Sequence, residues 1–285
     1  MKISGYILAR YNNMANSYTC YRLVDEAKSL GMDIRLIGVE DSWIEDGILY
    51  NSGEALLPRD FLINRYKTGI LRHQINLLAK RTYNQSDNYR KYVNKFNQVR
   101  DLRSDYFTIP HYILTTSTIS YDILRTRIGS PFVAKGLESS MGREIFLIND
   151  ENELDTLRTQ FGSEKEWLFQ EFIHTSRGRD LRVFAIRDRA VAAMTRQSQN
   201  DFRANVALGA SVKAVPITSE INHIVRDIYD QTHLDFVGID LLFGDNTFYL
   251  CEINVMPGLE GIEKSSGINI AKVIMETIIS DYNNE

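Results

Sequence analysis

Two runs of alternating apolar and polar residues near the carboxyl-terminal end constrain the fold of this chain more than any other feature. The runs are Phe236–Phe243 and Phe248–Asn254, and the cluster Gly244-Asp245-Asn246 lies between them. Alternation with a period of two is typical of half-buried β-strands, and such a cluster is typical of a tight turn. The pattern therefore predicts a β-hairpin, which we expect to close through an odd loop of residues 245–247.

The predicted hairpin places acidic side chains side by side. With that loop, Asp240 lies directly opposite Glu252, and the period of two puts Asn254 on the same face. The neighbours on this face are Leu242 and Leu250, so water is poorly placed to screen two opposed like charges. A bound cation resolves the conflict, and two carboxylates with an amide oxygen suit Mg²⁺. The alternative is a solvated hairpin with scattered acids.

The bulk composition limits the class of protein. The 285 residues are 44% hydrophobic and 25% charged, as in an ordinary soluble globular protein of one large or about two to three small domains. A formal net charge of -4 and a pI near 5.8 argue against a nucleic-acid partner, because nucleic-acid binders are normally strongly basic. The opening MKISGYILAR is unlike a signal peptide, and no long uncharged apolar stretch follows, so we expect no membrane partner.

Cysteine and histidine usage excludes several kinds of site. Cys20 and Cys251 lie far apart and match no metal or redox spacing, so we expect a cytoplasmic protein. The five histidines show no metal-ligand spacing, and no nucleophilic triad can be argued from the sequence. Covalent catalysis by the protein therefore has no support.

The beginning of the chain reads as strand, helix and strand. An apolar run at residues 3–9 precedes apolar residues at helical spacing, and Gly31 ends that helix before a second apolar run at residues 34–39. Such a βαβ unit usually opens a doubly wound domain. No glycine-rich dinucleotide fingerprint follows the first strand, so the chain lacks that cofactor signal.

The segment 59–103 is basic, with eleven Lys or Arg and three Asp or Glu. One interpretation is a set of solvated helices, and the other is a positive surface that attracts an acidic substrate. After Pro110 the pattern changes to short strands with intervening helices, which indicates an α+β body. The predicted strands are residues 132–135, 145–148, 167–173, 181–186 and 190–195, with helices at 151–159, 221–228 and 270–278.

Lys135 ends the apolar strand PFVAK and precedes a loop of residues 136–142. A lysine on a rigid strand can hold a phosphate as a point charge, while small loop residues let backbone N–H groups approach the phosphate oxygens. The alternative is a solvent-exposed strand end, because lysine side chains usually reach water.

A second group of charged residues follows downstream. Asp180 and Arg182 share one face of the predicted strand GRDLRVFAI, and the next segment supplies Arg196, Arg203 and Asn205. Arginines bind phosphate or carboxylate oxygens bidentately, which suits a transferring phosphoryl group or a developing oxyanion. The alternative is a surface network of ion pairs, to which acids such as Asp180 and Asp201 contribute.

Together these segments resemble an ATP-grasp ligase, and more narrowly the RimK type, which adds glutamate to a carboxyl terminus. The most specific match is CEINVMPGLEGIEKSSGINIA at residues 251–271, which resembles the carboxy-terminal signature of that family nearly residue for residue. Further matches are QEFIHTSRGRDLRVFAI, NDFRAN, and NKF with Pro110 fifteen residues after its lysine, so the resemblance covers about residues 90–275. The first ninety residues fit the family's leading domain more loosely, with INRYKTG as the best match.

The resemblance implies a fold class that combines α/β and α+β parts. It implies a leading pre-ATP-grasp domain at residues 1–90, and two α+β lobes at residues 91–173 and 174–285 that clamp ATP. Lysines would contact the phosphates, and a hinge pair would hold adenine and ribose. The residues implied to bind ATP are Lys95, Lys135, Glu171, Phe172, Asp180, Arg203 and Asn205, and those implied to carry Mg²⁺ or Mn²⁺ are Asp240, Glu252 and Asn254.

The implied reaction begins when a substrate carboxylate attacks the γ-phosphoryl group of ATP and forms an acylphosphate. An amine, expected to be that of L-glutamate, then displaces phosphate through a tetrahedral oxyanion, for which Arg203, Arg196 and Arg182 are the expected catalytic residues. The expected acceptor is a carboxylate such as the carboxyl terminus of a protein or peptide. Other acceptors stay open, namely an amino-group carrier protein, a small metabolite or a crosslinked peptide, as do a non-catalytic ATP-binding regulator and a homo-oligomer.

One position departs from the family pattern. The phosphate loop of the family usually has a second glycine two residues after the one that matches Gly142, and this chain has Glu144 there. A side chain at that position narrows the approach of backbone to phosphate, and its negative charge repels phosphate. Either the loop closes differently or Arg143 compensates.

Overall fold

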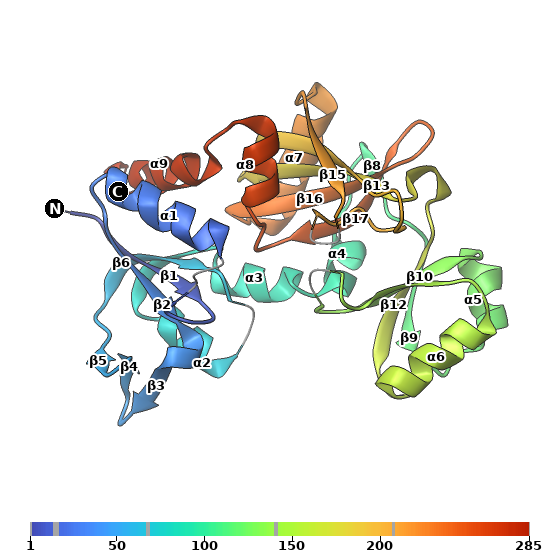
Figure 1. Cartoon of the computed structure of the whole chain (residues 1–285), viewed down its shortest axis with the longest axis horizontal. Helices are drawn as coiled ribbons and strands as arrows, with labels where there is room; N and C mark the ends of the chain where they lie inside the picture. Colours follow the sequence, from blue (N-terminus) through green and yellow to red (C-terminus); the bar gives the residue numbers. More distant parts are fainter. Residues whose placement is uncertain (1, 14–16, 67–68, 140–141, 207–208, 285) are drawn as a thin grey trace.

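The computed structural model of the chain (Figure 1) describes residues 2–13, 17–66, 69–139, 142–206 and 209–284. Within these ranges the strands form two four-stranded sheets, one six-stranded sheet and one three-stranded sheet. Figure 1 shows the N-terminal sheet on the left, the six-stranded sheet in the upper centre and a smaller lobe on the right. Helices α3 (Ser86–Tyr92) and α4 (Lys95–Asp101) cross the middle of the molecule.

The N-terminal sheet is parallel and covered on both faces. Its strand order is β2 (Asp33–Gly38), β1 (Ser4–Ala9), β6 (Arg59–Asn64) and β7 (Ala79–Tyr83). On one face, Ile7 and Phe61 pack with α1 (Tyr18–Ser29) and α9 (Ile270–Asn283). On the other face, Leu8 and Leu62 pack with α2 (Ile70–Asn76). The predicted βαβ unit is confirmed, and its apolar strands follow from burial on both faces.

The interpretation of the basic segment as a set of solvated helices is wrong for its strands. β6 and β7 lie inside the N-terminal sheet, where Phe61, Leu62 and Tyr83 are fully buried. Arg72 on α2 and Lys95 on α4 are buried as well. A short apolar strand between basic residues offers too few positions for its period to show in the sequence.

A small antiparallel sheet that the sequence did not predict precedes β6. It consists of β3 (Ser42–Glu45), β4 (Ile48–Asn51) and β5 (Glu54–Ala55), after a 3₁₀ turn at Val39–Asp41. Leu49 and Leu56 join the core on the α2 side of the N-terminal sheet. The small sheet therefore completes the cover of that face.

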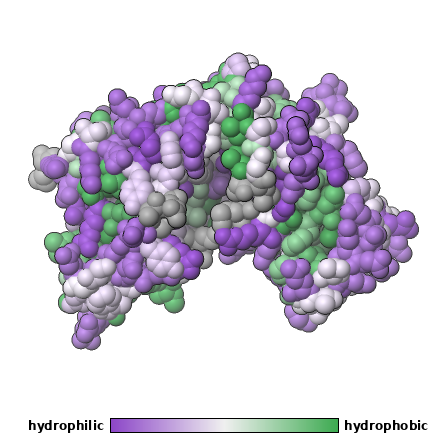
Figure 2. Space-filling model, in the orientation of Figure 1, coloured by the Kyte–Doolittle hydropathy of each residue, from purple (hydrophilic) through white to green (hydrophobic). Residues whose placement is uncertain are grey.

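The smaller lobe is an antiparallel sheet with helices on one face. Its strand order is β11 (Ile145–Ile148), β10 (Phe132–Gly136), β12 (Glu166–Glu171) and β9 (Tyr112–Thr116). Helices α5 (Tyr121–Ile128) and α6 (Glu151–Phe161) pack on Phe132, Trp167 and Phe169. Because side chains alternate along a strand, Lys135 points to the opposite face. Figure 2 shows that the surface is notched between this lobe and the rest of the molecule.

The large sheet separates apolar from charged side chains. Its strand order is β15 (Ser211–Val215), β14 (Arg189–Gln197), β13 (Arg179–Ile186), β16 (Phe236–Phe243), β17 (Phe248–Asn254) and β8 (Phe107–Thr108). Helix α7 (Ser219–Thr232) packs through Ile224 and Ile228 on Val183 and Ile239. The register puts the polar residues on the other face, with Asp180 opposite Arg196 and Asp240 opposite both Arg182 and Glu252.

The hairpin of β16 and β17 is confirmed, but the odd loop is wrong. Phe243 pairs with Phe248, and the Gly244 N–H donates to the Thr247 carbonyl at 2.8 Å, so the loop spans the four residues 244–247. An even loop alone would move every partner by one residue. A β-bulge at Cys251 restores the shift, since this extra residue on β17 is skipped by the pairing.

The bulge explains why one predicted contact is confirmed and another is wrong. Asp240 pairs with Glu252 as predicted. Leu250 pairs with Leu241 in the core under α7, so it is not a neighbour of the acids. Leu242 pairs with Tyr249 instead. The acidic pair is therefore less enclosed by leucine side chains than the regular register implied.

The carboxyl-terminal helices return to the N-terminal sheet. Helix α8 (Glu260–Ser266) carries Glu263, which accepts hydrogen bonds from the Tyr18 hydroxyl and the Ala271 N–H, both at 2.9 Å. Helix α9 packs against α1, as Figure 1 shows at the upper left. The division of the chain at residues 90 and 173 stays a prediction, because both ends of the sequence share this core. No helix in the described part of the chain is long and apolar enough to cross a membrane.

Candidate functional site

Helix α4 holds Lys95 against the strand that carries Glu252. Asn94 caps the helix, with its Oδ1 accepting from the Phe96 N–H at 2.9 Å. The side-chain amide of Gln98 bonds both backbone groups of Ile253, accepting from its N–H at 2.8 Å and donating to its carbonyl at 3.0 Å. These paired bonds fix the helix to β17, one residue from Glu252.

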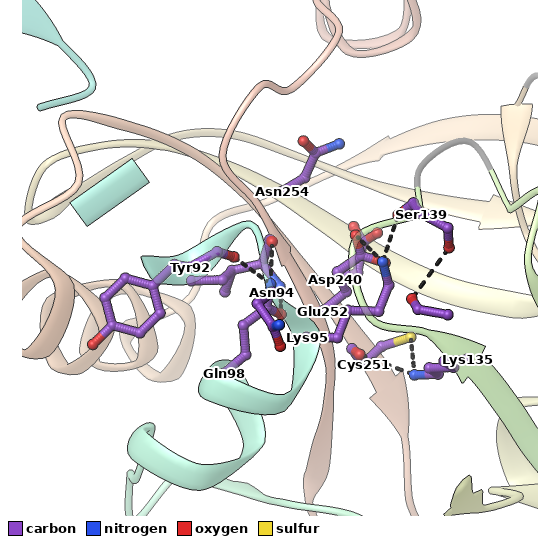
Figure 3. A network of polar contacts seen from close by, with 12 residues as sticks. Tyr92, Asn94, Lys95, Gln98, Lys135, Ser139, Asp240, Cys251, Glu252 and Asn254 are labelled. Carbon is purple, nitrogen blue, oxygen red and sulfur yellow. Dashed lines mark hydrogen bonds and ion pairs between the residues drawn. The ribbon is translucent and has the colours of Figure 1, made fainter. Parts of the chain in front are cut away.

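Two buried lysines connect the loop of the smaller lobe to β17 (Figure 3). Lys95 Nζ donates to the Ser139 carbonyl at 2.6 Å and lies 3.6 Å from Glu252 Oε1. Lys135 Nζ donates to the Cys251 carbonyl at 3.1 Å. Lys95 is 3% exposed and Lys135 is 6% exposed, so the interpretation of Lys135 as a solvated strand end is wrong. A buried ammonium group needs oxygen partners, and these two place positive charge at the bulge residue Cys251 and at its neighbour Glu252.

Asp240 is ion-paired with two arginines. Nε and Nη2 of Arg182 donate to its two oxygens, the second at 2.6 Å, and Arg196 Nη2 lies 2.9 Å from Oδ2. Burial pushes the pKa of Asp240 up, but the two guanidinium groups outweigh burial and hold this pKa below its usual value. Arginine side chains of the protein therefore already balance Asp240, and a bound cation as the resolution of the conflict with Glu252 stays a prediction.

Arg196 also binds Asp180. Its Nε and Nη2 donate to the two oxygens of Asp180 at 2.7 and 2.6 Å, and both residues are buried. Burial raises the pKa of Asp180 above its usual value, and the negative charge of Asp240 adds to the rise, although Arg196 opposes both. The alternative of a surface network is wrong in its location, because these ion pairs lie inside the protein.

The cluster has one excess positive charge. Four cationic side chains and three carboxylates meet beside β17, namely Lys95, Lys135, Arg182, Arg196, Asp180, Asp240 and Glu252. Burial raises the pKa of the Cys251 thiol at the centre of the cluster. The positive charge of Lys135 lowers this pKa, and the negative charges of the three carboxylates raise it further. A partly enclosed cationic cluster of this kind attracts a polyanion.

The three oxygen donors predicted to carry a metal keep acceptor sites open, and their role as ligands stays a prediction. Among the described residues Glu252 accepts no hydrogen bond, and Asp240 Oδ1 accepts one, from Arg182. Asn254 Oδ1 accepts from the Met256 N–H at 2.9 Å and keeps a second lone pair. No three His, Cys, Asp or Glu side chains within the described ranges form a metal-holding group. A divalent cation here would need phosphate or water oxygens as well, which is usual for Mg²⁺.

Arg203 and Asn205 lie against the end of the loop that follows β10. Gly142 has φ of 72°, and a Cβ added there would lie 2.5 Å from Asn205 Nδ2, so the position requires glycine. Arg203 Nη1 donates to the Gly142 carbonyl at 2.7 Å. Asp201 holds Arg203 in place by accepting from Nε at 3.0 Å and Nη2 at 2.7 Å. Arg203 therefore fastens this loop of the smaller lobe, and Asn205 lies against the same glycine.

The side chain of Glu144 lies against the end of strand β10 in the smaller lobe. A Cβ added to Gly136 would lie 2.0 Å from Glu144 Oε2, so the carboxylate covers that glycine. Lys165 Nζ lies 2.7 Å from Glu144 Oε1 and over the rings of Phe161 and Trp167. Lys165, which the sequence did not single out, balances the charge of Glu144.

Glu171 and Phe172 lie where β12 leaves the smaller lobe. The Glu171 N–H donates to the His111 carbonyl at 2.8 Å, and Glu171 Oε2 accepts from the His111 N–H at 3.3 Å. The ring of Phe172 contacts that of Phe202, with centroids 6.2 Å apart. The pair thus occupies the connection between the two lobes, as predicted for a hinge, while its contact with adenine stays a prediction.

Sequence reasoning missed residues whose role is to position others. Gln98, Ser139 and Lys165 are polar residues in ordinary helical or loop surroundings, and their partners lie 155, 44 and 21 residues away. A single sequence has no signal for such long-range pairs. In contrast, the period that puts Asp180 and Arg182 on one strand face, and the period of the hairpin that carries Asp240, are visible in the sequence.

Comparison with known proteins agrees with this geometry. A family model described as "RimK-like ATP-grasp domain" matches residues 93–278. A probable alpha-L-glutamate ligase of Legionella pneumophila (strain Corby) is 30% identical over 276 residues, which cover 92% of this chain and 91% of that protein.

Two solved structures are similar in fold. The ATP-grasp ligase PsnB, complexed with a phosphomimetic variant of its minimal precursor, Mg and ADP, has a TM-score of 0.71 at 14% identity and covers 98% of this chain and 99% of its own. D-alanine–D-alanine ligase from Bacillus anthracis, complexed with ATP, has a TM-score of 0.69 at 14% identity, with coverage of 95% and 94%. These likenesses confirm the predicted fold class.

Proposed function

Because the chain belongs to the RimK-like ATP-grasp family and is an ATP-dependent carboxylate–amine ligase, we propose that it joins L-glutamate through its amine to a carboxylate acceptor. The proposed acceptor is the carboxyl terminus of a protein or peptide. The reaction releases ADP and phosphate. The observation that carries the proposal is the cationic cluster beside Glu252, which combines an excess positive charge with unshared carboxylate and amide oxygens.

We propose that the lysines bind the phosphates of ATP. Lys95 and Lys135 come from different elements, and their ammonium groups lie beside Glu252 and Cys251. Phosphoryl transfer needs little covalent chemistry from the protein, so positioning and charge neutralisation supply most of the catalysis. Glu171 and Phe172 at the connection would hold the adenine end, and Asn205 would hold the loop closed over the phosphates. Asp180 fixes Arg196 and is proposed to contact the ribose.

A divalent metal, proposed to be Mg²⁺, would be held by Asp240, Glu252 and Asn254 together with phosphate oxygens. When bound, it supplies charge neutralisation for the phosphates. The chain's own arginines keep Asp240 ionised, since they hold its pKa below the usual value. Glu252 remains available because its pairing with Lys95 is long, at 3.6 Å.

We propose that Arg182 and Arg196 stabilise the oxyanion when the amine attacks the acylphosphate. Both use Nε and Nη2 for aspartate, and Nη1 of each donates to no residue in the described part of the chain. A rigid donor held in this way is worth roughly 3 kcal/mol of barrier. Arg203 is engaged with Asp201 and Gly142, so its proposed part is to fasten the loop that keeps water from the acylphosphate.

Mass spectrometry tests this proposal. Candidate peptides and small carboxylates are incubated with the protein, ATP, Mg²⁺ and a pool of amino acids, and we expect a mass increment of one or more glutamate residues. ADP release should require both an amino acid and an acceptor. Tight ATP binding without turnover for any pair would instead indicate a regulator.

A matched variant tests the site itself. Glu252→Gln keeps the shape of the side chain but removes its charge, so we expect turnover to fall at least about 1000-fold while the urea midpoint stays within error. Full activity in this variant would show that Glu252 is not a ligand of the metal.

A further inference from the structure

Arg72 on helix α2 is a buried arginine with an unused hydrogen-bonding edge. It is 3% exposed, and its guanidinium carbon lies 4.1 Å from the centre of the Tyr89 ring. Its Nε and Nη2 are buried and bond to no described residue. A buried charge without a partner is costly, so this edge calls for an anionic ligand.

Three other arginines of this protein bind carboxylates through the Nε and Nη2 edge of the guanidinium group. Arg182, Arg196 and Arg203 each direct Nε and Nη2 at the two oxygens of one aspartate. The spacing of these two donors matches the two oxygens of a carboxylate. Stacking on Tyr89 fixes the plane of Arg72 without using that edge. The unused edge therefore has the geometry for a carboxylate.

Arg65 supplies a second positive charge at the same place. It directly follows β6, and its Nη1 donates to the Pro257 carbonyl at 2.9 Å. Within the described ranges neither Arg65 nor Arg72 has a carboxylate at ion-pair distance. Burial raises the pKa of the Tyr89 hydroxyl to about 12, the positive charges of Arg72 and then Arg65 act in the opposite direction, and the negative charge of Glu138 adds to the rise. Both arginines thus lie around one tyrosine.

Arg65 lies near the switch point of the N-terminal sheet, a position where ligands commonly bind in open parallel sheets. The strand order β2-β1-β6-β7 reverses its direction of progress between β1 and β6. In open parallel sheets, ligands bind outside the carboxyl ends of the strands at such a switch point. Arg65 is the first residue after the carboxyl end of β6.

Arg65 also bonds to a loop that lies close to the proposed reaction centre. Its partner Pro257 lies three residues after Asn254, and a Cβ added to Gly238 would lie 3.0 Å from Pro257 Cβ and 3.2 Å from Arg182 Nη1. One small glycine therefore separates the loop bonded by Arg65 from the unpaired nitrogen of Arg182.

We propose that Arg72, assisted by Arg65, binds the non-reacting carboxylate of the amino acid that supplies the amine. This inference rests on the proposed function and names a subsite for it. An amino acid joined through its amine keeps its own carboxylates throughout the reaction, so a fixed guanidinium can hold one of them while the amine reaches the acylphosphate. The reacting carboxylate of the acceptor cannot serve, because it must lie at the γ-phosphate.

Entry of the ligand requires α2 to move away from α3, since both nitrogens of Arg72 are shielded. Helix α2 is short, and Ile70 at its amino-terminal end is 82% exposed. At the other end Asn76 is buried and donates to the Ser86 hydroxyl of α3 at 3.2 Å, so we expect the amino-terminal end to open. Elements with few buried apolar contacts open at low cost. Amide exchange in residues 70–76 should therefore change when the amino acid binds.

The test compares Arg72→Met with Arg59→Met in the whole enzyme. Arg59 also stacks on a tyrosine, Tyr6, but it is paired with Asp33 and lies at the amino end of β6. For Arg72→Met we expect the KM for the amino acid to rise about 10- to 100-fold, with the KM for ATP and kcat within about twofold. Arg59→Met should leave all three unchanged. Arg72→Lys keeps the charge but loses the paired donors, so it should raise the same KM and guards against misfolding of the methionine variant.

Substrate analogues identify the carboxylate. L-Glutamate is compared with L-glutamine and with its α-amide, and the analogue that lacks the bound carboxylate should bind wild type weakly but lose nothing further in Arg72→Met. An unchanged amino-acid KM in both Arg72 variants of an active enzyme would overturn the inference and leave the proposed function intact.

A binding measurement separates failure of this inference from failure of the proposed function. Thermal midpoints are recorded with a non-hydrolysable ATP analogue, Mg²⁺ and L-glutamate, or the amino acid that the mass screen names. We expect the amino acid to raise the midpoint of wild type and of Arg59→Met, but not of Arg72→Met. A wild type without turnover that still shows this pattern keeps the subsite. Equal shifts in all three proteins, or none in wild type, would overturn it.

Discussion

The buried arginines of the large sheet and those of the N-terminal sheet are in opposite situations. Arg182 and Arg196 lie among carboxylates, with Asp180 and Asp240 taking both of their paired donors. Arg72, which is as buried as Arg196, has no carboxylate within ion-pair distance in the described part of the chain, and stacks on Tyr89 instead.

The difference separates arginines that are paired by carboxylates of the protein itself from an arginine that we propose is paired by a carboxylate of the ligand. Paired arginines are fixed before any substrate arrives, so they can act as rigid donors without reorganising. An unpaired buried arginine carries a desolvation cost that a substrate carboxylate removes, which favours binding at the expense of stability. The two sets should therefore respond in opposite ways when their charges are removed.

The largest effect is expected at Asp240. Asp240→Asn takes from Arg182 its paired carboxylate, while Arg196 keeps Asp180, and the cluster gains an uncompensated charge, so we expect a loss of about 3 to 5 kcal/mol in the free energy of unfolding. Turnover should be lost as well, since this residue is a proposed metal ligand. Urea denaturation with an unchanged m-value measures the stability. A loss below about 1 kcal/mol would mean that solvent screens the cluster.

The same substitution at two arginines tests the comparison directly. Arg196→Met leaves the buried Asp180 without its ion-pair partner, while Asp240 keeps Arg182, and we expect a loss of about 3 kcal/mol or more. Arg72→Met removes an unpaired charge and puts an apolar chain on Tyr89, so we expect no loss or a gain of about 1 kcal/mol. Urea midpoints without substrate measure both. Equal destabilisation by the two variants would show that Arg72 is a structural residue.

The sequence predicted the paired set far better than the unpaired one. Asp180 and Arg182 alternate with apolar residues along one strand, and Asp240 does so in the hairpin, so the period of two predicted the face of each set separately. The pairing of Asp240 with Glu252 was predicted through a loop that is wrong, and it holds because the bulge at Cys251 compensates for the even loop. A bulge depends on packing across the sheet, and no local pattern in the sequence marks it.

The sequence could not reveal the situation of Arg72. A basic residue in a segment rich in Lys and Arg reads as part of a solvated or cationic surface, and burial is decided by helices α2 and α3 packing together. The same limitation hid the partner of Glu144, since Lys165 reaches it only through the strand pairing of the smaller lobe. The open alternative of a positive surface for an acidic substrate is the one that the proposed Arg72 subsite develops.

A partly exposed pair should give an intermediate response. Arg203 and Asp201 are each 25% exposed, and the pair holds the Gly142 carbonyl in place. We expect Asp201→Asn to cost about 1 kcal/mol of stability and to raise the KM for ATP several-fold, because the loop loses its fastening. Enzyme kinetics with saturating amino acid and acceptor measure this change. An unaltered KM for ATP would mean that Asn205 alone holds the loop.

The smallest effect is expected at Asp101, which sets the baseline for an ion pair near the surface. The hydrogen bond from Arg100, followed by that from Lys91, lowers the pKa of Asp101 to about 2, and the two cationic side chains are 50% and 46% exposed. Since Asp101 titrates lower in the folded protein than in the unfolded chain, its contribution is complete above about pH 4 and is lost as the pH falls toward 2. For Asp101→Asn we expect a loss of at most about 1 kcal/mol at neutral pH, with no difference from wild type near pH 2. Urea midpoints of the two proteins across this range measure the effect, and a difference that persists at pH 2 would assign it to packing rather than charge.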